Sequence, residues 1–207
     1  FRLPWSTRFL PLLLPFAAVS LLAMVLAPDA EARPNLKRRG GQWDVTVGAT
    51  ACIPGQAECE HDEVADLTGR TRMSFGTGAS LGYRLRKWAF VGASYNFGLF
   101  RPDFDYAASA FQAETAYQNS VFGEFRPILP VWRFDFGVGL APGFSRLTFK
   151  TNGGDKQFSQ GFAFKLAPTI DVFVARRIFL GAKLDLIFNA HGKTCTRIGD
   201  TTECVDT

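Results

Sequence analysis

A long predicted hairpin over residues 71–99 is the strongest constraint on what this chain can fold into. In its first arm the odd positions of 73–85 are mostly apolar, whereas the even positions of 72–84 are glycine, serine or arginine. After a tight turn at 86–88, the alternation resumes over 89–99. Because successive side chains of a strand point to opposite faces, this pattern predicts one bulky apolar face and one small polar face. The polar face lacks the bulk to form a core, so we expect lipid outside and polar groups inside a barrel.

The same alternation predicts five further strands, which gives seven in total. They cover residues 42–51, 115–125, 132–140, 158–172 and 178–189. Pro168 has no backbone donor, and we expect it to cause a local break or bulge in its strand. Long polar loops at 52–69, 100–114, around 151–155 and after Asn189 alternate with short links at 86–88, 126–131 and 175–177. This asymmetry is typical of transmembrane barrels, whose short turns all lie on one side of the membrane.

Aromatic residues gather close to the short links. Such residues form girdles where a barrel crosses the membrane interface. The predicted girdle consists of Trp43, Tyr83, Trp88, Phe125 and Trp132.

The amino terminus has the pattern of an export signal. Arg2 and Arg8 precede an apolar run over 9–27, and the small-residue site Ala30-Glu31-Ala32 follows it. We therefore predict a signal peptide over 1–32, cleaved after Ala32, with an uncleaved membrane anchor as the alternative. Residues 33–41 form a short basic leader that we interpret as a solvated linker.

The net charge of +4 is too small and too scattered to indicate a nucleic-acid partner. The chain has 21 phenylalanines, yet its mean hydropathy is only +0.03. A helical membrane protein would be more apolar, because each span needs about 20 mostly apolar residues.

Over residues 42–189 the chain resembles the small outer-membrane barrels of the OmpA and OmpX type, in pattern and length rather than in a diagnostic motif. The resemblance implies an all-β, antiparallel, up-and-down transmembrane β-barrel of the eight-stranded type, of which seven strands are found here. An unclosed edge would leave backbone groups unpaired in lipid. We therefore expect 42–207 to be a barrel domain whose last strand is missing through truncation. Closure by the 33–41 leader or by oligomerisation is the less favoured alternative.

Charged residues of both signs fall at inward-facing positions. We interpret them as ion pairs that plug a narrow lumen, with a proton or solute path as the alternative. The predicted lumen network comprises Asp44, Arg72, Arg84, Glu124, Arg133, Asp135, Lys165, Asp171, Lys183 and Asp185.

The four cysteines lie in two predicted loops, as Cys52 with Cys59 and Cys195 with Cys204. In an exported protein two local disulfides are the simplest pairing, although four cysteines permit three connectivities and a zinc site is a sharper alternative. The two histidines, His61 and His191, lie in or beside loops, and the sequence places no serine beside His191.

The expected role is structural or interactional, at the outer membrane of a Gram-negative-type cell. The expected partners are membrane lipids and, through the loops, surface ligands; no catalytic residue or cofactor is predicted. The alternatives are a narrow channel or hydrophobic-solute carrier, and a lipid-modifying enzyme with His191 as its base. A soluble calycin-like barrel is a further alternative, but its interior should be the apolar face.

Overall fold

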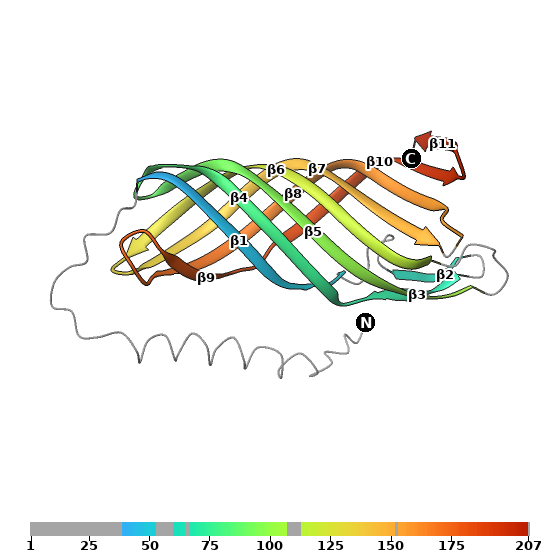
Figure 1. Cartoon of the computed structure of the whole chain (residues 1–207), viewed down its shortest axis with the longest axis horizontal. Coiled ribbons are helices and arrows are strands. Elements are labelled where there is room, and N and C mark those ends of the chain that lie inside the picture. Colours follow the sequence, from blue (N-terminus) through green and yellow to red (C-terminus); the bar gives the residue numbers. More distant parts are fainter. Residues whose placement is uncertain (1–38, 53–59, 65–66, 107–112, 152, 207) are drawn as a thin grey trace, which may run out of the picture. The chain divides into compact units, whose positions relative to one another are not determined.

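The computed structural model describes residues 39–52, 60–64, 67–106, 113–151 and 153–206 (Figure 1). All of them belong to one compact unit, Leu36–Thr207. The predicted signal peptide, most of the basic leader and Cys59 lie outside the described residues.

The described residues form eleven strands and no helix. In Figure 1 the long strands run side by side, tilted in the same sense. They are β1 (Gly40–Thr50), β2 (Glu60–Val64), β3 (Leu67–Arg72), β4 (Ser74–Arg86), β5 (Ala89–Tyr106), β6 (Ala113–Val131), β7 (Phe134–Thr151), β8 (Lys156–Phe173), β9 (Phe179–Lys183), β10 (Leu186–Ile198) and β11 (Thr201–Asp206).

The sheet is antiparallel, and consecutive long strands are neighbours. Its order is β1-β4-β5-β6-β7-β8-β10-β11. The short β9 pairs with the last residues of β8, on the same side of β8 as β10. The short β2–β3 hairpin pairs with the end of β5. The predicted all-β, antiparallel, up-and-down fold is therefore confirmed.

The sheet curls so that its polar face is concave. Side chains from strands far apart in the sheet order meet on this face, as when Lys183 Nζ of β9 lies 3.5 Å from Ser80 Oγ of β4. Likewise, Asn96 of β5 donates to Asp185, in the link between β9 and β10, at 2.7 Å. Such contacts require the polar faces of the first and last strands to turn toward each other.

The sheet is not closed. Among the described residues, β1 pairs only with β4. At the other end of the sheet, β9 and the first part of β10, up to Gly192, have no partner strand on the side away from β8. The rest of β10, from Lys193 to Ile198, pairs with β11. Five antiparallel strands separate β1 from β9 and β10, so the two free edges run in the same direction.

The predicted short link at 126–131 is wrong, because β6 continues to Val131 and the chain turns at Trp132 and Arg133. The ladder with β7 runs to the pair Val131↔Phe134. Pro130 is tolerated because its nitrogen faces the same side as the Ile128 N–H, which donates to the carbonyl of Trp88, just before β5 begins at Ala89. Beyond Ile128, β6 is an edge on that side, and an edge strand can include proline. The nitrogen of Pro127 faces β7, and the ladder with β7 has no pair at Arg126 or Pro127.

The predicted break at Pro168 is also wrong for its own strand, since β8 is continuous and Pro168 pairs with Val138 of β7. The interruption lies in the next strand, where β9 ends at Lys183 and β10 begins at Leu186. Pro168 has no N–H to donate to the strand on this side. Here one hydrogen bond is made, from the Leu184 N–H to the Pro168 carbonyl at 3.1 Å, and Leu184 lies in the interruption between β9 and β10.

Three segments predicted as loops contain strands. The first loop, 52–69, includes β2 and the start of β3, and the second, 100–114, includes the end of β5. The predicted tail after Asn189 is the upper part of β10 and the β10–β11 hairpin. In β2, β3 and the β10–β11 hairpin no apolar face repeats at every second residue, so their polar composition hid them. At the end of β5, Phe100, Phe104 and Tyr106 do alternate with polar residues, but Pro102 and the two aspartates suggested a loop.

Candidate functional site

The two faces of the sheet have opposite chemical character. The outer face exposes large apolar side chains such as Val47 and Leu81, which are 70% and 69% exposed. The inner face buries charged groups, and Arg126, Lys165 and Glu124 are among the largest fully buried side chains of the described residues.

Glu124 of β6 lies at the centre of the buried charges. Its Oε1 accepts hydrogen bonds from Arg126 Nη2 at 2.6 Å and Nε at 2.9 Å. Its Oε2 lies 3.4 Å from Lys165 Nζ and 3.9 Å from Lys183 Nζ. One carboxylate therefore contacts three cations, from β6, β8 and β9.

Two further carboxylates balance these cations. Asp44 Oδ2 lies 3.7 Å from Arg126 Nη2, and Asp185 Oδ1 lies 3.7 Å from Lys183 Nζ and 4.0 Å from Lys165 Nζ. Three cations and three carboxylates thus form one neutral group, which we call the central ion cluster. It consists of Asp44, Glu124, Arg126, Lys165, Lys183 and Asp185.

Neutral side chains complete the central ion cluster. Lys165 Nζ donates to Ser94 Oγ at 2.7 Å and to Asn96 Oδ1 at 3.1 Å, and Ser80 Oγ donates to Asp44 Oδ1 at 2.9 Å. Since an unpaired buried charge is strongly unfavourable, these hydrogen bonds help to offset the cost of burying the charges.

A second ion pair lies beside the short turn between β4 and β5. The buried guanidinium of Arg84 pairs with the buried carboxylate of Asp135 on β7. Arg84 also donates to the carbonyls of Arg86 and Lys87, so one side chain connects the turn to a strand three positions away in the sheet.

Three residues of the predicted lumen network do not join these groups through an ion pair described above. Arg72 is exposed at the end of β3, so its inward assignment is wrong: β4 begins only at Ser74, and the inward series begins there. Arg133 is half-buried in a turn, with its guanidinium carbon 5.3 Å from the centroid of the Trp132 ring. Asp171 is half-buried on β8.

Arg126 is the cluster residue that sequence reasoning missed. It falls in the predicted 126–131 link, whereas in the structure it continues the inward series of Gln118, Ser120 and Glu124 along β6. That periodicity was a usable signal, and the two nearby prolines obscured it.

His191 of β10 lies in a hydrogen-bonded chain across the interior. Its Nδ1 is 2.7 Å from Ser159 Oγ, and its Nε2 is 2.7 Å from Ser145 Oγ. Ser145 donates to Asn189 Oδ1 at 2.7 Å, and this oxygen also accepts from Gln118 Nε2 at 3.1 Å. Because the single proton of Ser145 goes to Asn189, the contact between Ser145 and His191 requires a proton on His191 Nε2.

Strand register explains why these residues meet. Ser145 of β7 and His191 of β10 both pair with Gly161 of β8, so the three positions form one row across the sheet. Glycine leaves this row open. A register shift between His191 and Lys193 marks a bulge, a feature that re-aims nearby side chains.

Gly161→Ala should destabilise the protein by about 1–3 kcal/mol, the typical effect of overpacking. The new Cβ would lie 2.6 Å from the Ala190 carbonyl oxygen and 2.8 Å from His191 Cα, both backbone atoms. Gly123→Ala is the matched control, because no atom lies within 4 Å of its Cβ position. Urea unfolding of both variants measures the difference, and equal stabilities would contradict the close packing of this row.

Two apolar layers fill the interior on either side of the His191 chain. Phe122, Ala141 and Ala163 pack with Ile187, and the second layer consists of Phe100, Ala116 and Leu147 with Cys52 and Phe149. The described interior is thus a stack of polar and apolar side chains, as expected for a narrow barrel.

The predicted girdle residues are exposed near the short turns. Trp43, Trp88 and Trp132 are 70%, 51% and 57% exposed, and Tyr83 and Phe125 are 48% and 46% exposed. They share the outer face of this end with Val91, which pairs with both Tyr83 and Phe125.

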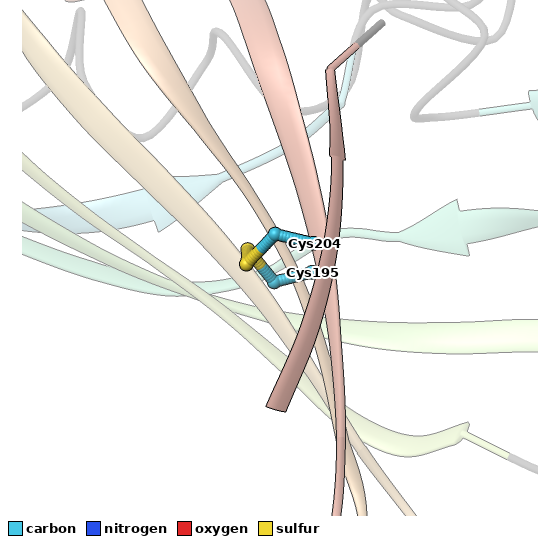
Figure 2. Close-up of a disulfide and its surroundings, with 2 residues drawn as sticks. All are labelled: Cys195 and Cys204. Carbon is cyan, nitrogen blue, oxygen red and sulfur yellow. A yellow bond between two sulfur atoms is a disulfide. The ribbon is translucent and has the colours of Figure 1, made fainter. Parts of the chain in front are cut away.

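The predicted disulfide between Cys195 and Cys204 is confirmed. Figure 2 shows it joining β10 to β11, where the two residues are directly paired in the ladder. Cys195 is buried and pairs on its other side with the buried Phe158 of β8. Cys52 is also disulfide-bonded.

The Cys204→Ser variant should release β11 from the sheet, because this strand pairs with β10 alone. The disulfide closes a short loop, and removing such a link lowers stability by about 2–4 kcal/mol. Amide hydrogen exchange should speed up over Thr201–Asp206 and change little in β7. Protection of β11 equal to that of the disulfide-bonded protein would contradict this dependence.

Comparison with models of known protein families, with curated proteins and with solved structures finds no match.

The site is therefore interpreted from its geometry. In the described part of the chain no helix has the length and apolar character to cross a bilayer. Among the same residues, no group of three or more His, Cys, Asp and Glu side chains is placed to hold a metal ion. What the arrangement supplies is a neutral, hydrogen-bonded interior and an outer surface that water solvates poorly.

Proposed function

We propose that this protein is an outer-membrane β-barrel protein with a structural or surface-interaction role and a lumen plugged by side chains. The observation that carries the proposal is the reversal of the usual protein surface. Apolar side chains cover the outer face and ion pairs lie inside.

The outer face is too apolar for water. Soluble monomers rarely expose contiguous apolar patches of more than a few hundred Å². Here exposed Val, Leu, Phe and Trp side chains recur on every long strand, at alternate positions such as Trp43, Val45 and Val47 of β1. Lipid-facing residues of membrane barrels have this distribution.

The interior argues against the soluble calycin-like alternative. A ligand-binding barrel of that class needs an apolar interior. Arg126 is among the largest fully buried side chains of the described residues, and it belongs to the central ion cluster.

A closed barrel would need one further strand between the two free edges. Since these edges run in the same direction, only a strand antiparallel to both continues the antiparallel pattern. β11 begins on the edge of β10 and has that direction. In lipid each unpaired backbone group is unfavourable by several kcal/mol, so closure is required for stable insertion.

The filled interior favours a structural or interactional role over conduction. The two apolar layers and the central ion cluster occupy successive levels of the described interior. The end of the sheet opposite the short turns, which we call the loop end, includes the β2–β3 hairpin, the end of β5 and the β10–β11 hairpin. We propose that these elements are the surface that meets ligands.

An enzymatic role is not favoured by the His191 chain. The Ser145 side chain is fully buried, and its hydroxyl proton goes to Asn189. A nucleophilic serine would have to direct that proton to the histidine.

Membrane fractionation followed by gel electrophoresis with and without heating tests the proposal. The protein should be recovered in the outer-membrane fraction. After extraction with detergent, it should migrate differently on the gel before and after boiling. Recovery in the soluble fraction, with one mobility under both conditions, would overturn it.

A further inference from the structure

Among the described side chains at the short-turn end of the sheet, the exposed charges are all positive. Exposed cations occur just before β1, at the end of β4 and in the turn after it, and in the link between β8 and β9. A half-buried arginine lies in the β6–β7 turn. We call these residues the cationic rim: Arg39, Arg86, Lys87, Arg133, Arg176 and Arg177.

The described carboxylates of this end are not exposed beside the cationic rim. Among the described side chains of this end, Asp44 and Asp135 point inward to Arg126 and Arg84, and Asp171 is half-buried on the inner face of β8. The opposite end differs. There Glu114, Asp200, Glu203 and Asp206 are exposed beside Arg101, Lys150, Lys193 and Arg197.

The cationic rim coincides with the aromatic girdle. Trp88 directly follows Lys87, and Trp132 directly precedes Arg133, whose guanidinium lies over its ring. Tryptophan belongs at the depth of lipid headgroups, and clustered Lys and Arg beside the bilayer bind anionic headgroups. The two features therefore place a cation layer at the level of phosphate groups.

We propose that the cationic rim binds the phosphate headgroups of anionic phospholipids in the leaflet at the short-turn end. This inference rests on the proposed membrane insertion. Only anionic lipid satisfies both observations, since a soluble acidic partner would not require tryptophan side chains beside the cations. The cationic rim would enrich such lipids around the barrel and would hold the short turns at the headgroups of one leaflet.

Bromine quenching of tryptophan fluorescence measures this enrichment directly. The protein without residues 1–32 is inserted into phosphatidylcholine vesicles that contain a minority of phosphatidylglycerol, with bromine on one lipid species at a time. At the same fraction of brominated lipid, brominated phosphatidylglycerol should quench about twofold more than brominated phosphatidylcholine. The excess should vanish in about 0.5 M NaCl, where the Debye length is roughly 4 Å.

Two fourfold variants separate the cationic rim from general charge. Arg86→Gln/Lys87→Gln/Arg176→Gln/Arg177→Gln should abolish the excess quenching. Arg101→Gln/Lys150→Gln/Lys193→Gln/Arg197→Gln removes the same charge from the loop end and should retain it. Equal quenching by both lipids in the unsubstituted protein overturns the inference even if the rim variant does not fold. Absence of quenching by either lipid would instead contradict membrane insertion.

Excess quenching that the rim variant retains would place the anionic lipid elsewhere and also overturn the assignment. Loss of the excess in the loop-end variant would show that net charge, rather than the cationic rim, attracts the lipid.

Discussion

Replacing Glu124 by Gln should lower the free energy of unfolding by about 3–5 kcal/mol, the effect of removing one partner from a buried ion pair. The substitution hardly changes side-chain volume, so the effect comes from charge. Arg126, Lys165 and Lys183 all lie within 4.0 Å of this carboxylate, whereas each of the other two carboxylates of the cluster contacts only one or two of these cations. Urea unfolding of the vesicle-inserted protein measures the change.

Glu203→Gln provides the matched control, because Glu203 is exposed on β11 and the chemical change is the same. Its effect should stay within about 0.5 kcal/mol. Adding Lys165→Met to Glu124→Gln should recover part of the loss, because one unbalanced cation is removed. A loss below about 1 kcal/mol for Glu124→Gln alone would contradict the central role of this carboxylate.

Replacing Ala93 by Arg should destabilise the inserted protein by about 2–4 kcal/mol, the effect of a guanidinium at the midplane of a lipid-facing surface. Ala93 is exposed in the middle of the outer face, where it pairs with Leu81 of β4 and Gly123 of β6. In water the same substitution at an exposed position would have little effect. Equilibrium unfolding from vesicles measures the difference.

Ala175→Arg is the control for position. Ala175 is also exposed but lies in the link between β8 and β9, beside Arg176 and Arg177. At the membrane interface an arginine should change stability by about 0–1 kcal/mol. Equal effects at the two positions would mean that the outer face does not contact lipid.

The long strands were predictable because an apolar side chain at every second residue is a strong local signal. Prediction failed where that signal is weak or where proline disguises it. The end of β6 was missed because Pro127 and Pro130 suggest a turn, and only the ladders with β5 and β7 show how both are accommodated. The β10–β11 hairpin was missed because its side chains are mostly polar.

The interior was predictable residue by residue but not contact by contact. Alternation assigns Glu124, Lys165 and Asp185 to the inner face, yet which charges meet depends on the register and curl of the sheet. His191 shows the same limit: Ser145 and Ser159 lie 46 and 32 residues away in the sequence, and Gly161 brings their strands into one open row.

Nitroxide scanning along Asn119–Phe125 of β6 tests the orientation of the faces most directly. Each residue is replaced in turn by a spin-labelled cysteine, and collisions with oxygen in lipid and with a water-soluble nickel complex are measured. Oxygen contact should be high at the exposed positions 121, 123 and 125 and low at the buried positions 120, 122 and 124. High nickel contact at 121, 123 and 125 would show that water covers the apolar face, and would contradict membrane insertion.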